Sequence, residues 1–246
     1  MAIWNEKGEL YHLGLREGDV GRYVLLPGDP GRVPLIASFL DDAKPVGNHR
    51  EYVTWTGTLL GEKVSVCSTG IGAPSTAIAA EELFAIGADT LIRVGTAGML
   101  QEEIEDEDIV VATGAVRDEG TSRQYIPLAY PAVADFQVVS ALVESAHVLH
   151  VGCHAGIIQS KDAFYGELEP ETMPAEPLLR YQWEAWKRGN VLSSEMEAAA
   201  LFVISSIRKK RAGCILNHLG KMETTIQVAV DGVKRLILSD RAKEAN

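Results

Sequence analysis

Cysteine is scarce in this sequence, and so are aromatic residues and long apolar runs. The 246 residues contain three cysteines, and no two of them have the spacing of a metal-binding or redox motif. Cys67, Cys153 and Cys214 each lie in an apolar stretch, which favours buried free thiols in a reducing cytosol. No apolar run approaches the length of a membrane span, and residues 1–10 carry no apolar signal region. We therefore expect a cytoplasmic protein with no membrane partner.

Positive charge is also in deficit. The chain has 23 lysines and arginines against 34 acidic residues, a formal net charge of −11. Such an acidic field disfavours nucleic acid as a partner, so an anion would have to bind at a locally built site. The basic run 208–211 is the main exception. It is interpreted as the solvated C-terminal turn of a helix.

Apolar runs that end in glycine alternate with stretches of helical spacing, while aromatic residues make up only 7%. The predicted strands are Tyr23–Leu26, Val64–Ser68, Thr90–Val94, Ile109–Ala112, Ala155–Ile158 and Cys214–Leu216. The predicted helices are Val33–Leu40, Ser75–Ile86 (with Glu81 and Glu82 outward), Phe136–Val148, Leu192–Ile207 and Thr224–Leu238. No repeat or linker interrupts them, so residues 1–246 are predicted to form a single domain. The pattern predicts a three-layer α/β/α fold with a central mixed sheet and ligands at the carboxyl ends of strands.

Two of the glycine-bearing strand ends carry arginine. In residues 27–32, Gly28 would let the backbone approach an anion, and Arg32 could point a guanidinium at it. In residues 92–98, Arg93 follows apolar strand residues directly before a Gly-x-x-Gly turn. A buried arginine needs a partner, which is either a structural carboxylate or a phosphate, with Thr96 adding a hydroxyl. We favour the phosphate, because the arginine stands at the turn.

Residues 194–197, Ser-Glu-Met-Glu, open a predicted helix. One interpretation is a capping box with Ser194 as N-cap and Glu197 as its third-position partner. The other is that the carboxylates hold the vicinal hydroxyls of a ribose. His12 taken alone is more typical of a surface or packed histidine.

Taken together, the motifs resemble the nucleoside phosphorylase family, and within it the uridine phosphorylase branch. They occur in family order over roughly residues 11–205, at 11–15, 27–30, 49–52, 68–75, 93–96, 131–135 and 194–197. The resemblance implies phosphorolysis of a nucleoside, most simply uridine, to free base and ribose 1-phosphate. Inorganic phosphate would be the co-substrate, and no organic cofactor is implied.

The resemblance also implies a role for each matching residue. The implied phosphate ligands are Gly28, Arg32, Arg93, Thr96 and, from a neighbouring subunit, Arg50. The implied ribose contacts are Thr96, Met196, Glu197 and, again from the neighbour, His12, and the residues implied in catalysis are Arg93, Glu197 and His12. The implied base contacts are Gly98, Phe164, Glu167, Leu168 and Glu195. Glu51, Ile71 and Ser75 match positions that hold a monovalent cation such as K⁺ at the dimer interface in some members, and the family implies a homohexamer built as a trimer of dimers.

Two departures concern the base. The family places a glutamine and a basic residue after the Phe-Tyr segment, whereas this chain has Glu167 and Leu168. An ionised Glu167 accepts hydrogen bonds but cannot donate one to a carbonyl, and its charge opposes a departing anion. The segment after Asn217 is also short, so the loop that covers the substrate is expected to be mostly missing. We therefore expect weak or altered base discrimination and low uridine turnover, unless another group recognises the base.

Two alternatives remain open. The same reaction could act on another nucleoside, either a purine or a broad set. A weakly active paralogue could instead serve as a nucleoside-binding or regulatory protein. A dinucleotide-binding module is disfavoured, because no Gly-x-Gly-x-x-Gly follows the first strand.

Overall fold

The computed structural model describes residues 3–218 and 222–245. Its strands are β1 (Tyr23–Leu26), β2 (Asp41–His49), β3 (Tyr52–Leu59), β4 (Glu62–Cys67), β5 (Thr90–Thr96), β6 (Gly98–Met99), β7 (Ile109–Asp118), β8 (Ala132–Val133), β9 (Cys153–Lys161), β10 (Ser193–Glu195) and β11 (Arg211–Asn217). Its helices are α1 (Arg32–Ala37), α2 (Ala73–Ala85), α3 (Ser122–Tyr125), α4 (Phe136–Val148), α5 (Phe164–Leu168), the 3₁₀ turn η1 (Pro170–Thr172), α6 (Glu176–Arg188), α7 (Ala198–Ile207) and α8 (Met222–Glu244).

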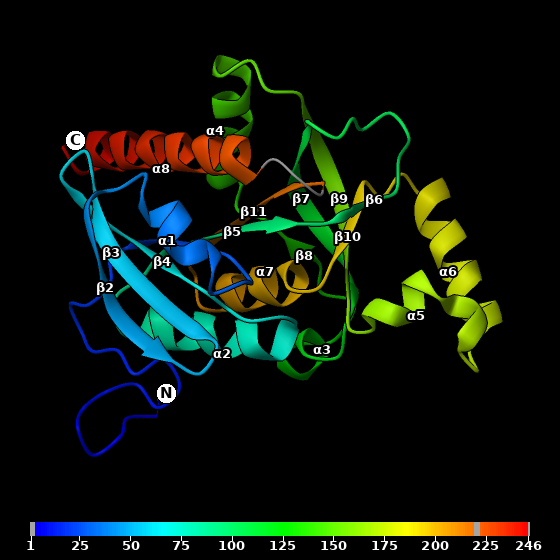
Figure 1. The fold of residues 1–246 in the computed structure, drawn as a ribbon, viewed down its shortest axis with the longest axis horizontal. Helices are drawn as coiled ribbons and strands as arrows, with labels where there is room; N and C mark the ends of the chain where they lie inside the picture. Colours follow the sequence, from blue (N-terminus) through cyan, green and yellow to red (C-terminus); the bar gives the residue numbers. More distant parts are fainter. Residues whose placement is uncertain (1–2, 219–221, 246) are drawn as a thin grey trace.

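One mixed sheet lies between two helical layers (Figure 1). One apolar cluster, with Leu83 and Phe202, packs α2 and α7 against one face. The other cluster, with Val33, Leu142 and Val233, packs α1, α4 and α8 against the opposite face. The central strands are apolar on both sides because both faces are covered, as in β1, where every residue is buried. The predicted three-layer α/β/α fold is confirmed.

The strand order brings distant parts of the chain to one edge. In the described residues the sheet runs β2-β3-β4-β1-β5-β11-β7-β9-β10-β6. Strands β4, β1, β5 and β11 are parallel, so their carboxyl ends share an edge, where Leu26 pairs with Arg93 and Thr96 with Asn217. β6 begins only two residues after β5 ends, yet it pairs with β10 at the far end of the path. The sheet therefore curls until β10 returns to the end of β5.

At the opposite end of these strands, where β1 and β11 begin, a charged network connects the sheet to α8. The Tyr23 hydroxyl donates to Asp240 at 2.6 Å, and Arg211 pairs with the same carboxylate at 2.6 Å. Although burial acts the other way, hydrogen bonds from Arg211 and Tyr23 lower the pKa of Asp240. The interpretation of 208–211 as one solvated helical turn is therefore wrong for Arg211, which opens β11 because its strand partners extend the backbone there. None of the described helices combines the length and apolar character that a bilayer crossing requires.

The prediction from sequence was wrong or silent for several elements whose structure depends on contacts with other parts of the chain. The predicted helix 192–207 is instead β10 followed by α7, because the backbone of Ser194 pairs with Gln159 and Gly98. The hairpin of β2 and β3 and the helices α5 and α6 were also not predicted. Glu82 was expected to face outward on its helix but is 4% exposed, because the N-terminal segment folds over it.

The N-terminus of α4 allows a direct test of how its capping residue contributes to stability. The Asp135 carboxylate accepts hydrogen bonds from the backbone N–H groups of Gln137 at 2.9 Å and Val138 at 3.1 Å. We expect Asp135→Ala to lower the free energy of unfolding in urea by about 1 kcal/mol, because it leaves helical N–H donors without a partner. Asp135→Asn keeps the acceptor and serves as the control. Equal stability of all three proteins would show that the cap contributes nothing.

Candidate active site

A buried arginine between two carboxylates forms the centre of the carboxyl edge. Arg93 Nε lies 2.7 Å from Glu195 Oε2, and its Nη2 lies 2.6 Å from Glu197 Oε2. Burial alone would lower the pKa of Arg93, but the two carboxylates outweigh it and raise that pKa above its ordinary value. The guanidinium therefore stays charged, with Nε and Nη2 engaged by protein.

Glu195 connects this arginine to the start of α7. Its Oε2 accepts from the backbone N–H of Glu197 at 2.9 Å, and its Oε1 accepts from that of Ala198 at 3.0 Å and from the Ser160 hydroxyl. The predicted capping box is wrong, because Ser194 lies in β10 and Glu195 supplies the acceptor for the helix. The Glu195 side chain is fully buried and both oxygens are used within the protein. This placement favours a supporting role over the expected base contact.

Glu197 links α7 to the loop before α2. Its Oε1 accepts the backbone N–H of Gly72 at 2.5 Å, where the chain turns with a φ of 94° that suits only glycine. Burial raises the pKa of Glu197, while Arg93 acts in the opposite direction. Each oxygen keeps a lone pair, so the carboxylate can still accept from a hydroxyl.

The predicted phosphate residues come from neighbouring strand ends. A Cβ placed on Gly28 would stand 3.9 Å from Arg93 Nη1 and 3.2 Å from the Gly70 carbonyl, so a side chain there would crowd the space beside Nη1. Arg32 begins α1 four residues after Gly28, and Thr96 ends β5 three residues after Arg93. Gly28, Arg93 and Thr96 thus lie at the carboxyl ends of β1 and β5, and Arg32 follows at the start of α1.

His12 is held in place by the buried Glu82. The His12 Nδ1 lies 2.7 Å from Glu82 Oε1, and Glu82 Oε2 accepts the backbone N–H of Leu13 at 2.9 Å. The His12 side chain keeps 26% of its surface exposed. Its Nε2 is therefore the nitrogen available for contact beyond this chain.

The predicted cation residues and Arg50 lie on the same exposed side as His12. Arg50 is exposed, has a left-handed φ of 56°, and stands 5.9 Å over the Tyr11 ring. A Cβ at Gly70 would lie 2.8 Å from Glu51 Cγ and 3.5 Å from Ser75 Oγ, and that hydroxyl is 3.2 Å from the Ile71 carbonyl. The stem of the Glu51 side chain and the Ser75 hydroxyl therefore lie around Gly70, and the Ile71 carbonyl is within reach of that hydroxyl.

The predicted base residues are gathered beside β10. Glu167 on α5 forms an ion pair with Lys161 at the end of β9, and its Oε2 lies 3.0 Å from the Ser194 hydroxyl. Leu168 is 60% exposed and Phe164 is 49% exposed. Gly98 pairs with Ser194 across β6 and β10, and Met196 is half-buried next to Glu197.

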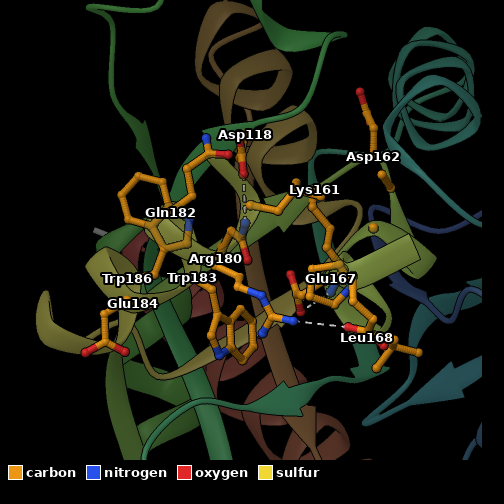
Figure 2. Close-up of a pocket in the computed structure, with 16 residues that line it drawn as sticks. Asp118, Lys161, Asp162, Glu167, Leu168, Arg180, Gln182, Trp183, Glu184 and Trp186 are labelled. Carbon is orange, nitrogen blue, oxygen red and sulfur yellow. Dashed lines mark hydrogen bonds and ion pairs between the residues drawn. The ribbon is translucent and has the colours of Figure 1, made fainter. Parts of the chain in front are cut away.

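A cavity of about 660 Å³ borders the Lys161–Glu167 pair and extends between α5 and α6, where Trp183 and Trp186 line it (Figure 2). Its lining residues include Glu167 and Leu168, two of the predicted base contacts, but not Arg93, Glu197 or Gly28. The expectation for Glu167 assumed an unpaired carboxylate. That assumption is wrong, because the turn from β9 into α5 brings Lys161 back against it.

Sequence reasoning missed Lys161, Glu82 and Ser160. The strand was predicted to stop at Ile158, so Lys161 fell outside it and received no role. Glu82 was predicted to face outward together with Glu81. For Lys161, the available signal was its position three residues before Phe164, opposite in charge to Glu167.

The chain belongs to the phosphorylase superfamily. The model of the family with that description matches residues 22–220, which include Arg93, Glu195 and Glu197. Among curated relatives, the chain is 48% identical to a uridine phosphorylase of Treponema pallidum, over 94% of this chain and 95% of that protein. It is 47% identical to a uridine phosphorylase of Thermococcus kodakarensis (97% and 91% covered) and 40% identical to a guanosine phosphorylase of Halorubrum lacusprofundi (95% and 91% covered).

The central cluster predicts a large effect on stability. Glu195→Ala removes a buried partner of Arg93 and the acceptor for the first amides of α7. We expect the free energy of unfolding to fall by about 3–5 kcal/mol, measured by urea denaturation. Glu184→Ala, which breaks an exposed ion pair with Arg188 on α6, is the matched control and should change nothing measurable. Equal stability of the two variants would contradict the central role of Glu195.

Proposed function

We propose that the chain catalyses the phosphorolysis of a nucleoside, with uridine as the leading substrate, to give free base and ribose 1-phosphate. The observation that supports this most is Arg93, held by Glu195 and Glu197 beside Gly28 at a strand edge. The chain that carries it is closely similar to named uridine phosphorylases along nearly its whole length.

Arg93 and Gly28 define the phosphate half of the reaction. Two nitrogens of Arg93 are fixed by carboxylates, so the guanidinium is oriented before an anion arrives. Phosphate then binds to Arg93 Nη1, the backbone at Gly28, Arg32 and the Thr96 hydroxyl. Held beneath C1′, it reacts as if in a single molecule, which lowers the barrier through orientation.

Glu197 and Met196 define the ribose half. The free lone pairs of Glu197 accept from a ribose hydroxyl, and the thioether of Met196 packs against the sugar. The C1′–N bond breaks through a state with oxocarbenium character, a phosphate oxygen forms the new bond to C1′, and the base leaves with the bonding electron pair. Donors near the base lower the barrier as its negative charge develops.

A complete site requires a second copy of the chain. Arg50 is exposed and His12 is partly exposed, which fits residues that enter a neighbour's site. We propose a homohexamer of three dimers, in which Arg50 completes the phosphate site and His12 contacts ribose. The free thiols Cys67 and Cys214, both buried, support a cytoplasmic location.

A monovalent cation fits beside this interface. The Glu51 carboxylate, the Ser75 hydroxyl and the Ile71 carbonyl offer oxygen ligands of the kind that hard cations prefer. K⁺ bound there would neutralise Glu51 and stabilise the subunit contact.

A second candidate substrate class is supported by one observation. The Halorubrum relative is named as a guanosine phosphorylase and is 40% identical over 95% of this chain. Phosphate-dependent release of base from uridine, thymidine, cytidine, guanosine, inosine and adenosine separates a uridine phosphorylase from a purine-specific one. A nucleoside that binds without any release would instead indicate a binding protein.

Arg93→Ala should lower kcat/KM for uridine at least about 100-fold, roughly the effect of one strong oxyanion ligand. Because the change also leaves two buried carboxylates without a cation, rates are compared below the unfolding temperature of each protein. Arg93→Lys keeps the charge but loses the planar fork, and should recover stability better than activity. Near-normal phosphorolysis by folded Arg93→Ala would show that phosphate binds elsewhere.

Shared sites predict complementation between inactive chains. Arg50→Ala and Glu197→Ala should each be inactive alone, because each damages every site. Mixed assemblies should regain part of the activity, because some sites then receive an intact Arg50 from one chain and an intact Glu197 from the other. If subunit exchange is verified with labelled chains and no activity returns, each site belongs to one chain.

A further inference from the structure

Glu82, on α2, is a buried carboxylate outside the arginine cluster. Its side chain is 5% exposed, and among the described residues its only ion-pair partner is His12. Glu82 Oε2 accepts the backbone N–H of Leu13 at 2.9 Å, and Oε1 accepts that of His12 at 3.2 Å. Oε1 also lies 2.7 Å from His12 Nδ1. The N-terminal segment therefore compensates a buried carboxylate that no lysine or arginine of residues 3–218 and 222–245 pairs with.

The segment around His12 has other anchors besides Glu82. The leucines that flank the histidine are fully buried, at Leu10, Leu13 and Leu15. The His49 ring donates from Nδ1 to the His12 carbonyl at 2.7 Å. A glutamine in place of Glu82 could still accept the two backbone N–H groups through its amide oxygen. The contact that distinguishes a carboxylate from an amide here is therefore the one with His12 Nδ1.

That contact determines which ring nitrogen of His12 carries the proton. An ionised carboxylate only accepts hydrogen bonds, so Nδ1 must be the donor. A neutral imidazole has a single N–H, which leaves Nε2 with a bare lone pair. The Tyr11 ring packs edge-on against the imidazole, with 4.9 Å between the ring centroids. Glu82 and Tyr11 thus hold the ring, and Nε2 is a hydrogen-bond acceptor on a side chain that is 26% exposed.

We propose, building on the function proposed above, that Glu82 is a positioning residue for the site of the neighbouring chain. Glu82 keeps His12 in the tautomer whose Nε2 accepts a hydrogen bond from a ribose hydroxyl in that site. The opposite tautomer, with its proton on Nε2, would direct a positive N–H edge at the sugar. Glu82 acts only through His12, because its own oxygens are used within its chain.

The pair of Glu82 and His12 suits the charge that develops during phosphorolysis. As the C1′–N bond breaks, the ribose acquires positive charge of oxocarbenium character. A bare Nε2 backed by the Glu82 carboxylate places negative potential at the sugar, and this attraction grows as the charge develops. Interactions that strengthen in the transition state act on kcat more than on KM. Loss of the tautomer should therefore slow turnover more than it weakens substrate binding.

The first test replaces the carboxylate by the isosteric amide. In Glu82→Gln the side-chain N–H₂ can donate to His12 Nδ1, which moves the ring proton to Nε2. We expect kcat for uridine to fall about 10-fold, the effect of one lost hydrogen bond, while KM stays within about twofold of wild type.

Glu81→Gln is the matched control for this test. Glu81 precedes Glu82 on α2, and its carboxylate pairs with Arg208 at 2.7 Å on the surface. This variant should keep the wild-type rate, because the pair is partly exposed. A fall in kcat of less than about twofold in folded Glu82→Gln, or equal falls in both variants, would overturn the proposal.

A double-variant cycle tests whether Glu82 acts through His12. On a His12→Ala background, Glu82→Gln should lower kcat by less than about twofold, because the ring that Glu82 orients is gone. A merely structural role for Glu82 would instead repeat the full loss on that background. Such additivity would overturn the proposal.

Uridine analogues that lack one ribose hydroxyl give a second readout. The kcat penalty of Glu82→Gln should disappear for one of 2′-, 3′- and 5′-deoxyuridine, namely the analogue without the hydroxyl that His12 contacts. The other two analogues should show the same penalty as uridine. Equal penalties on all three would contradict an action through one hydroxyl and overturn the proposal.

Mixed assemblies show in which chain's site Glu82 acts. When Glu82→Gln chains are mixed with an excess of Glu197→Ala chains, each Glu82→Gln site receives His12 from a chain with intact Glu82. The activity per Glu82→Gln chain should then rise up to about 10-fold, to the wild-type value. If subunits exchange and this activity does not rise, the proposal is overturned while the proposed function stands. A wild type that releases base from no nucleoside would overturn both.

Discussion

The ion pairs of Arg93 with Glu195 and Glu197 are the interaction on which the site depends. A buried guanidinium is tolerated only with compensating charge, and both carboxylates come from the short segment where β10 becomes α7. This requirement fixes β5 against that segment. Through the Gly72 amide it also fixes the loop before α2. Three elements far apart in sequence are thereby held at one strand edge, and one guanidinium nitrogen remains directed at Gly28.

The charges around Arg93 are compensated locally, although the chain as a whole is acidic. The chain carries a net charge of −11, and the two ion-pair partners of Arg93, the proposed phosphate ligand, are carboxylates. Their charge is compensated by Arg93, and they fix the direction of its guanidinium. Lys161 and Glu167 form a second, nearly buried ion pair, in which the cation compensates the carboxylate. Ser194 and Glu195 are adjacent residues of β10, and they contact the two ion pairs from opposite faces of the strand.

The sequence was informative wherever function is encoded locally. The strand 23–26 and the helix 136–148 were predicted with their observed bounds, because apolar periodicity and turn residues define them without help from elsewhere. The ordered motifs indicated the family that the comparisons then established. Features that depend on partners across the sheet were missed. β10 was read as helix, Glu82 as solvent-facing, and Glu167 as unpaired, because each is determined by a residue from another element.

The two ends of the central strands carry two separate charged clusters. Asp240, Arg211 and Tyr23 lock the last helix to the edge where the strands begin, whereas the arginine cluster occupies the edge where they end. A directed-evolution campaign could therefore treat them as separate libraries. Substitutions around Asp240 would tune resistance to heat without changing which nucleoside is cleaved. Substitutions around β10 would vary the proposed substrate site on an unchanged scaffold, and a tag appended after α8 would lie near the edge where the strands begin.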